Sequence, residues 1–498
     1  MKTGSISFLA VTGILVALAF PARALSDRDQ EVYRVAFRAA ESRQWDEARR
    51  VTQQAENRLL SRVLDWIILT DGETQPEFSA VTEFMRSNPD WPRQAVLKRK
   101  AEQSMPEDLP VQDVLDWFSR NPPETPAGAV RHARALLGNG QEPQAQIFVR
   151  DFWVRATFGS VEEKDWLQEF GSFLTPADHR ARLERLVWDD QSAPARRMLP
   201  LVDAETAAVA GQRLKFITLA SDAEKSLSRL PENLRQDPGL LYDRVRWLRR
   251  KNRDEEAARV LKDLPSAASR PDKWWPERQT VIRRLMEKGD YSTAWTLAGA
   301  HGQTEGLGLL EAEFLAGWLA LRKNREPAAA LGHFERLYRA AATPISLSRG
   351  AYWAAQACEK AGRGKEARDW YRKAAVHRTA FYGQLAAQAL NTDLSLPADA
   401  VPDDRHRQEF EARELVMATR LLGRLEQAAG QGETRQWAGI FLRHLGTSDN
   451  PASQLVLVAE LAQELGYPDI AIAAAKNAAL QGMFLFPASY PLVDVSVD

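Results

Sequence analysis

The sequence is poor in residues that form covalent or metal crosslinks. Cys358 is the only cysteine in 498 residues, so no intramolecular disulfide can form and packing must stabilise the fold. The histidines are also dispersed, and no two lie within four positions: His132, His179, His301, His333, His377, His406 and His444. No local metal-binding pair therefore exists, and we expect neither a metal nor another cofactor.

An excess of positive charge is also missing. The net charge of −1 argues against a nucleic-acid-binding protein, which usually has a strongly basic face. The main basic run, residues 244–253, leads directly into Asp254, Glu255 and Glu256, as at a helix C-terminus before an acidic helix start. No G-x-S-x-G elbow, P-loop or complete dinucleotide fingerprint occurs. Residues 362–365 (GRGK) have the wrong spacing for a phosphate loop, and we interpret them as a hairpin turn.

The N-terminus has the pattern of an export signal. Lys2 precedes an uncharged apolar stretch at residues 6–20, and residues 21–24 (PARA) supply a small-residue cleavage site. We expect residues 1–24 to be a signal peptide cleaved after Ala24, which leaves an exported chain without a membrane span. The alternative is an uncleaved anchor, although the apolar stretch is short for that purpose.

A spacing of five residues between Gly or Asn and Ala recurs along the chain. The pairs are Gly140/Ala145, Asn252/Ala257, Gly289/Ala294, Asn324/Ala329, Gly362/Ala367, Gly423/Ala428 and Gly466/Ala471. Gly or Asn can end a helix in the left-handed conformation, and a small Ala lets the next helix approach closely. The pattern predicts helical hairpins, which stack because one hairpin cannot bury both of its apolar faces. Strand signals are scarce, so we predict an all-α superhelical solenoid of tetratricopeptide-like hairpins that forms a ring or horseshoe.

One clear break interrupts the helical pattern. Residues 391–404 (NTDLSLPADAVPDD) contain turn residues and have no helical period, so we expect a linker there. The expected organisation is a superhelical domain at 25–390, a helical domain at 405–481 and a tail at 482–498. Within the second domain, helices are expected at 407–430, 434–445, 453–466 and 468–481.

Few residues qualify as catalytic or sugar-binding candidates. Glu41-Ser42 lies in a segment that reads as a hairpin turn, so we interpret it as structural. Most of the fifteen tryptophans fall on expected core faces. The Trp274-Trp275 doublet at a helix start is the best candidate for sugar stacking, with core packing as the alternative.

Several segments resemble the soluble lytic murein transglycosylases of Gram-negative bacteria. The most specific are residues 84–105 (FMRSNPDWPRQAVLKRKAEQSM), 183–201 (LERLVWDDQSAPARRMLPL), 237–261 (DPGLLYDRVRWLRRKNRDEEAARVL), 312–318 (AEFLAGW), 344–362 and 381–383 (FYG). The resemblance covers nearly the whole chain after residue 24. It implies the family's α-superhelical domain and helical linker domain, with structural roles for Trp353, Phe381, Tyr382 and Gly383.

In that family a lysozyme-like domain cleaves the bond between N-acetylmuramic acid and N-acetylglucosamine and releases a 1,6-anhydro product. Its signature, a Glu-Ser followed by Gly-Leu-Met-Gln and an aromatic-rich Asn-Tyr segment, does not occur in this sequence. We therefore expect no catalytic residue here and no activity from this chain alone. The resemblance implies glycan strands of peptidoglycan as the ligand and a monomeric chain. The alternative is a non-enzymatic periplasmic scaffold that binds a protein partner through its concave surface.

Overall fold

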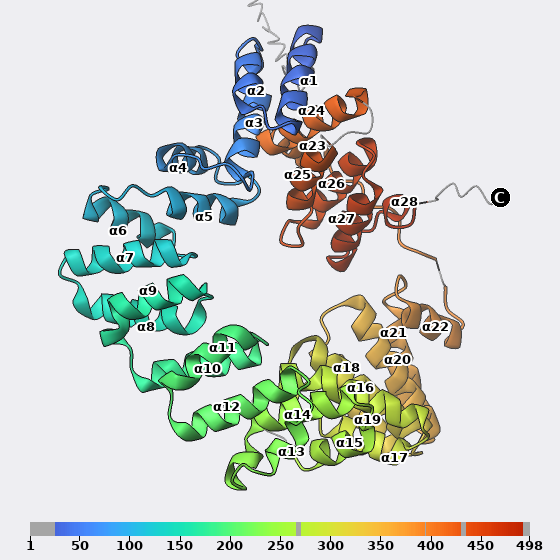
Figure 1. The fold of residues 1–498 in the computed structure, drawn as a ribbon. Helices are drawn as coiled ribbons and strands as arrows, with labels where there is room; N and C mark the ends of the chain where they lie inside the picture. The colour runs from blue at the N-terminus through green and yellow to red at the C-terminus, as the bar shows by residue number, and fades with distance from the viewer. Residues whose placement is uncertain (1–24, 265–269, 394, 430–434, 492–498) are drawn as a thin grey trace, which may run out of the picture. The chain divides into compact units, whose positions relative to one another are not determined.

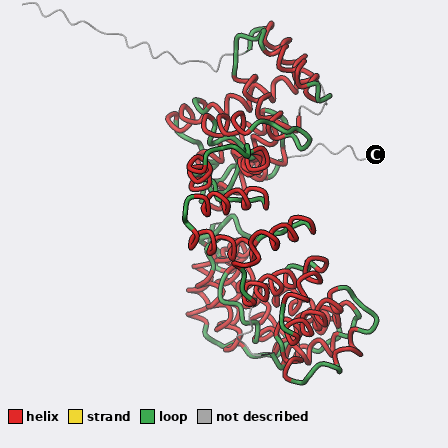
Figure 2. The backbone as a smooth tube through the Cα atoms, turned by 60° about the vertical axis from the view of Figure 1, so that its left-hand side comes forward, coloured by secondary structure: helices red, strands yellow, loops and turns green. Residues whose placement is uncertain are grey.

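Helices form all of the regular structure in the part of the chain that is described. The computed structural model describes residues 25–264, 270–393, 395–429 and 435–491 (Figures 1 and 2). The predicted signal peptide lies outside these residues. The predicted all-α fold of helical hairpins is confirmed. Within the described ranges, no helix has both the length and the apolar composition that a bilayer span requires.

The chain divides into two compact units, which we name by where their residues come from. The central unit comprises residues 101–398, and the terminal unit combines residues 1–100 with residues 399–498. The sequence-based domain boundaries, including the break at 391–404, stay predictions. The contacts add that residues 399–491 pack with helices from the other end of the chain.

The central unit is a succession of antiparallel helices, seen from cyan through green and yellow to light orange in Figure 1. Its α-helices are α6 (Val111–Arg120), α7 (Pro126–Gly138), α8 (Glu142–Arg155), α9 (Ser160–Phe170), α10 (Pro176–Trp188), α11 (Ser192–Met198), α12 (Ala204–Ile217), α13 (Ala223–Leu227), α14 (Pro238–Arg250), α15 (Asp254–Lys262), α16 (Pro271–Glu287), α17 (Tyr291–Gly299), α18 (Gly306–Arg322), α19 (Pro327–Ala340), α20 (Pro344–Lys360), α21 (Gly364–Ala375) and α22 (Phe381–Ala389). Three 3-10 turns join them: η1 (Gly171–Phe173), η2 (Leu199–Leu201) and η3 (Asn233–Gln236). Proline occupies the first turn of many of these helices, where its missing N–H costs no hydrogen bond.

Several turns between paired helices share one hydrogen-bond pattern. In the α20–α21 turn, Gly362 has a φ of 72° and its N–H donates to the Glu359 carbonyl at 3.0 Å. The next N–H, of Arg363, donates to the Cys358 carbonyl at 2.8 Å. These are the two bonds of a Schellman C-cap. The same two bonds and a positive φ occur at Arg43, Gly140, Asp190, Asn252, Gly289 and Gly466.

A buried alanine follows each of these turn residues at the fifth position. The alanines are Ala48, Ala145, Ala195, Ala257, Ala294, Ala367 and Ala471, and none is more than 2% exposed. Each lies in the first turn of the second helix, where a methyl group lets the two backbones approach. The five-residue spacing is therefore a property of the hairpin, and it also holds where Arg or Asp replaces Gly.

Two of the predicted turn residues need correction. Asn324 does not adopt the left-handed conformation; Arg325 does, with a φ of 58°, and the buried alanine is Ala330. This turn is wider, because the N–H of Glu326 reaches back to the carbonyl of Ala320, at 2.9 Å. Gly423 lies inside a helix, α24 (Glu414–Ala429), where an added Cβ would come within 2.7 Å of the Leu465 side chain. Its small size permits a close helix contact and does not form a turn.

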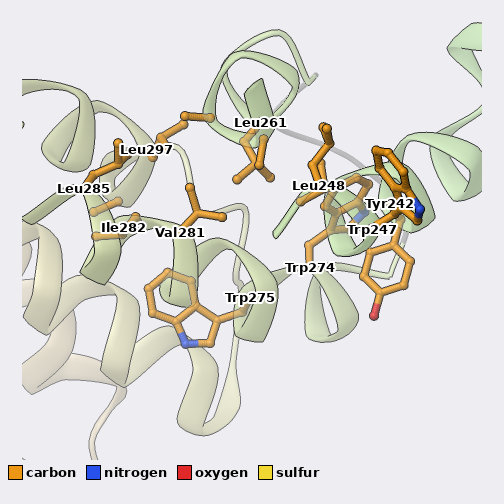
Figure 3. Close-up of a cluster of buried hydrophobic side chains, with 14 of the residues drawn as sticks. Tyr242, Trp247, Leu248, Leu261, Trp274, Trp275, Val281, Ile282, Leu285 and Leu297 are labelled. Carbon is orange, nitrogen blue, oxygen red and sulfur yellow. The ribbon is translucent and has the colours of Figure 1, made fainter. Parts of the chain in front are cut away.

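The core of the central unit runs along the stacked hairpins as a series of aromatic and aliphatic clusters. One cluster extends from Trp188 through Tyr242 and Trp247 to the helices around Leu319. Figure 3 shows Trp274 grouped with Tyr242 and Trp247, with Trp275 apart from them. The ring centroids of Trp274 and Tyr242 are 5.2 Å apart in an edge-on arrangement.

The terminal unit joins helices from both ends of the sequence. Its helices are α1 (Asp27–Glu41), α2 (Trp45–Thr52), α3 (Leu59–Thr70), α4 (Phe78–Ser87), α23 (Asp404–Glu411), α24, α25 (Arg435–Leu445), α26 (Ala452–Glu464), α27 (Pro468–Leu480) and α28 (Phe486–Ser489), while α5 (Gln94–Ser104) crosses the boundary between the units. Helices α1 and α3 contact α24. The expected single helix at 407–430 is wrong: α23 and α24 are separated at residues 412–413, and Phe410 is buried in the last turn of the first. The expected tail contains the short helix α28, and residues 492–498 lie outside the described residues.

Aromatic packing holds the two ends of the chain together in the terminal unit. The Phe441 ring of α25 lies 4.8 Å from the Trp66 ring of α3 and 5.4 Å from the Trp91 ring. Trp437 contacts Phe37 of α1 at 5.7 Å. Because Trp66 and Phe441 are both fully buried, this contact forms the core between segments about 375 positions apart in the sequence.

Candidate functional site

Four helices of the central unit place polar and aromatic side chains next to one another. Helices α16, α18, α20 and α22 alternate along the chain, and each contacts the next. We define the candidate face by seven residues of these helices: Gln279, Glu311, Phe314, Arg349, Tyr352, Phe381 and Tyr382. On its α16–α18 side, Nε1 of Trp275 and Nε2 of Gln279 donate to one carboxylate oxygen of Glu311, at 3.0 and 3.3 Å.

Arg349 is the cation of this face, and its charge is not neutralised by an ion pair. Its guanidinium carbon lies 4.7 Å from the centroid of the Phe314 ring, a cation–π contact. Among the described residues it forms neither a hydrogen bond nor an ion pair, and its Nε is buried without a partner. Burial lowers the pKa of Arg349, although the nearby Tyr382 and Glu311 oppose that effect. Arginine keeps its charge at neutral pH, so this cation has free donors.

Aromatic rings continue the candidate face from Arg349 to α22. Tyr352 is three residues after Arg349 on the same helix, and its ring centroid lies 5.4 Å from that of Tyr382. Tyr382 also contacts Trp353 at 6.3 Å and Phe381 at 5.2 Å. The hydroxyl groups of Tyr352 and Tyr382 make no hydrogen bond within the described part of the chain. Phe381 is 67% exposed, so its ring is open to a ligand.

A shallow groove adjoins Phe381. It has a volume of about 360 Å³ and is lined by Phe381, Gln384, Leu385, Gln388 and Leu396. The first four of these residues follow the i, i+3, i+4, i+7 spacing that places them on one side of α22. An exposed ring beside amide groups combines apolar and hydrogen-bonding surface at one place.

The other buried charges of the central unit are held by ion pairs or hydrogen bonds, which indicates structural roles. Among the described residues Arg278 has no ion pair and donates only to the Leu297 carbonyl, at 3.2 Å. Glu163 is shared by Arg182, at 3.1 Å, and Arg197, at 2.7 Å. Arg213 pairs with Asp243 at 2.8 Å, with both side chains almost completely buried. The basic run at 244–253 is likewise engaged: Arg246 binds Asp190 at 2.8 Å, and other arginines of the run bind Glu224, Glu256 and Glu277.

Two histidines meet at a buried carboxylate, Glu313 of α18. Nδ1 of His333 lies 2.6 Å and Nε2 of His301 lies 3.4 Å from its oxygens, and Nε of Arg336 donates at 2.6 Å. Burial raises the pKa of Glu313, but the hydrogen bonds from these three residues outweigh it and hold the pKa well below its ordinary value. Arg336 supplies the counter-charge, so the cluster is an internal ion pair. Within the described ranges, no group of three or more His, Cys, Asp or Glu side chains is arranged to hold a metal ion.

The remaining sequence-predicted residues lie as follows. Trp274 and Trp275 are 2% and 3% exposed, so both pack in the core and neither offers a ring face to a sugar. Glu41 ends α1 and Ser42 is its C-cap, so this dipeptide lies at a helical hairpin turn. Gly362 lies in the turn before α21, whose first residue is Gly364. Trp353 is buried against Phe314 and Phe334.

Gly383 has a specific steric role in the Phe-Tyr-Gly segment. A Cβ at this position would lie 2.0 Å from the carbonyl oxygen of His377 and 3.1 Å from that of Ala374. Both are backbone atoms, Ala374 in the last turn of α21 and His377 two residues after that helix, and backbone cannot move aside as a side chain could. Only glycine therefore lets α22 pack at this distance, and this packing places Phe381 and Tyr382 beside Tyr352.

Several residues of the candidate face could not be identified from the sequence. Arg349, Tyr352 and Glu311 lie in ordinary amphipathic helices, and nothing in their spacing distinguishes them from surface or core residues. Phe381 and Tyr382 are distinguished in the sequence only by the family resemblance. The lack of an ion pair at Arg349 cannot be read from the sequence, because it depends on where the carboxylates of other helices lie in the folded protein.

Comparison with solved structures identifies the fold. The 70 kDa soluble lytic transglycosylase from Escherichia coli matches with a TM-score of 0.63 and 17% sequence identity, covering 94% of this chain and 73% of that chain. The 70 kDa soluble lytic transglycosylase in complex with bulgecin A matches with a TM-score of 0.62 and 16% identity over the same shares. The chain has the superhelical fold of the soluble lytic transglycosylases.

A third structure agrees with this assignment. An inactive mutant of lytic transglycosylase Slt from Pseudomonas aeruginosa matches with a TM-score of 0.62 and 18% identity, covering 92% of this chain and 70% of that chain. No protein-family model matches the chain, and no curated protein sequence matches it. The resemblance first noted in short sequence segments is thus confirmed as a resemblance of fold.

Proposed function

We propose that this chain acts in peptidoglycan turnover as the superhelical, non-catalytic part of a lytic transglycosylase. The observation that carries the proposal is the match to soluble lytic transglycosylases along 92–94% of the chain. The export pattern at residues 1–24 adds a periplasmic location, the compartment where peptidoglycan is accessible. In this function the helical hairpins bind glycan strands, and cleavage requires a catalytic Glu that we do not expect among residues 1–498.

The candidate face offers the kinds of groups that such a ligand needs. Sugar rings present apolar C–H faces and many hydroxyl groups, so they bind to aromatic rings bordered by hydrogen-bonding side chains. Phe381 and Tyr382 supply rings, while Gln384, Gln388 and the Tyr352 hydroxyl supply hydrogen-bonding groups. These features support glycan binding more directly than they support a protein partner, which would need a larger contact area, about 800 Å² on each side.

Sedimentation with purified cell-wall sacculi tests the proposal. Residues 25–498 are mixed with sacculi freed of attached protein and pelleted, with cellulose particles as the control for nonspecific adsorption. We expect the chain to pellet with sacculi and to remain in the supernatant with cellulose. If it stays in the supernatant with both, the proposed function is wrong, and a scaffold for protein partners becomes the better explanation.

Product analysis tests the non-catalytic part of the proposal. After incubation with sacculi, the supernatant is examined by liquid chromatography and mass spectrometry for 1,6-anhydro-muropeptides. We expect none above the level without protein, because glycosidic cleavage needs a positioned proton donor. Release of these products by residues 25–498 alone would contradict the assignment and would require a search for an acidic residue among those present.

A further inference from the structure

The unpaired guanidinium of Arg349 is the starting point. Removing a charged group from water is unfavourable unless new partners replace the water. The fully buried Arg182 binds two carbonyl oxygens and Glu163, and the buried Arg213 binds Asp243 and Glu184, so each charge has carboxylate partners although one nitrogen of each lacks an acceptor. Arg349 is half-buried and differs from them because it has neither a hydrogen bond nor an ion pair within the described residues; its guanidinium contacts the Phe314 ring, and its Nε is shielded from water. An anionic group from outside the described residues would give the Arg349 guanidinium the hydrogen-bond acceptor and counter-charge that it lacks.

The surroundings of Arg349 indicate what else the ligand contains. The free hydroxyls of Tyr352 and Tyr382 can both donate and accept hydrogen bonds. Glu311 is already held by Trp275 and Gln279 and forms no ion pair with Arg349, so its second oxygen can accept from a hydroxyl or amide group. A cation, neutral hydroxyls and an exposed phenyl ring match a sugar that carries a carboxylate and an acetamido group.

We propose that Arg349, Tyr352, Tyr382 and Phe381 form a subsite for the N-acetylmuramic acid residue of a peptide-free glycan strand. Arg349 binds the lactyl carboxylate, because a guanidinium matches the geometry of a carboxylate with two parallel donors. The tyrosine hydroxyls bind the sugar, and the Phe381 ring packs on the face of a neighbouring sugar along the strand. The inference rests on the proposed function and adds the group that is recognised.

The choice of a peptide-free strand follows from the chemistry of the lactyl group. Where a stem peptide is attached, that carboxylate is an amide and carries no charge, so it cannot pair with Arg349.

Three probes separate the sources of the ligand chemistry: glycan oligosaccharides from amidase-treated sacculi, chitotetraose without any carboxylate, and the free stem peptide with carboxylates but no sugar. Calorimetric titration of residues 25–498 with each probe measures the preference. We expect the peptide-free glycan to bind at least about tenfold more tightly than either of the others.

Two variants test the residues. Arg349→Met keeps an unbranched stem against Phe314 and removes the cation, so we expect about tenfold or greater loss of affinity for the peptide-free glycan and no change for chitotetraose. Phe381→Ala removes an exposed ring and should weaken both oligosaccharides about three- to tenfold. The matched controls are Arg372→Met, an exposed arginine of α21, and Val376→Ala, an exposed side chain after that helix; both should bind as the wild type does.

Each outcome has a distinct meaning. If the chain binds sacculi and both variants bind peptide-free glycan as the wild type does, the subsite is wrong while the proposed function stands. Equal wild-type affinity for chitotetraose, or tighter binding of the stem peptide, overturns recognition of the lactyl carboxylate. If the wild type binds neither sacculi nor oligosaccharides, both proposals fail. Thermal midpoints of all variants show whether Arg349→Met is folded. If Arg349→Met does not fold, Phe381→Ala still tests the subsite, because Phe381 lies on the surface.

Discussion

Three glycines of the segment from the α20–α21 turn to α22 lie in different environments, so substitution by alanine should change the free energy of unfolding differently at each. Gly362 has a φ of 72°, and no atom lies within 4 Å of the position that a Cβ would take. Gly364 is the first residue of α21, also in open space but without a positive φ. Gly383 is helical, but its Cβ would lie 2.0 Å from the His377 carbonyl oxygen.

The expected effects of alanine follow from these environments. Gly362→Ala should cost about 1–2 kcal/mol, because the left-handed conformation is unfavourable for a residue with a Cβ. Gly364→Ala should be neutral or stabilise by up to about 1 kcal/mol, because alanine loses less backbone entropy in a helix. Gly383→Ala should cost about 3 kcal/mol or more, because the clash is with backbone and α22 must move away from α21.

Thermal unfolding followed by circular dichroism provides the ranking, at roughly 2 °C or more for each kcal/mol. The exposed substitution Lys365→Ala is the control for the same hairpin. Hydrogen exchange then locates the effect: Gly383→Ala should increase exchange in α22, and Gly362→Ala in the turn. If Gly383→Ala melts together with Lys365→Ala, the close approach of α22 to the His377 carbonyl is wrong. If Gly362→Ala is as stable as Gly364→Ala, the left-handed turn is wrong.

Three further predictions concern other parts of the fold. Arg182→Met should destabilise by about 3–5 kcal/mol, because it removes one partner of a buried ion pair; the exposed Arg155→Met should cost less than about 1 kcal/mol in the same denaturation assay. Hydrogen bonds from Thr206 lower the pKa of Asp203 to about 2. Asp203→Ala should therefore destabilise fully above about pH 4, where the carboxylate is charged in both states, and progressively less toward pH 2. Thermal midpoints of both proteins across that range measure the difference, and a difference that does not change with pH would contradict this reasoning. Phe441→Ala should cost about 3–5 kcal/mol and raise hydrogen exchange in α3 and α25, whereas unchanged exchange in α3 would exclude the packing of Phe441 on Trp66.

The hairpin repeat was visible in the sequence because it depends on local rules. A left-handed C-cap favours Gly or Asn, and the alanine five residues later lies in the first turn of the next helix whichever hairpin is considered. The same rules explain what the pattern missed. Arg43 and Asp190 adopt the left-handed conformation without being Gly or Asn, since two Schellman hydrogen bonds and the buried alanine outweigh a cost of about 1–2 kcal/mol.

Gly423 shows the limit of reasoning from residue type. It matched the spacing of a turn, yet it lies within α24 against Leu465. Glycine is suited both to a positive φ and to a close helix contact, and only the neighbouring helix distinguishes the two roles. Similarly, nothing local marks the break between α23 and α24, where Phe410 is buried and α23 contacts α26.

The sequence by itself determined the fold class, because helix ends, hairpin turns and apolar periodicity depend on residues close together in the chain. Tertiary structure alone decided that both ends of the chain share one unit, where Trp66 and Phe441 bury each other. It also decided which charges are neutralised. The buried Arg182 and Arg213 find carboxylates on other helices, whereas the half-buried Arg349 pairs with no carboxylate of the described residues. Pairing of this kind depends on distances between helices, and these distances are set by packing across many residues that no local pattern encodes.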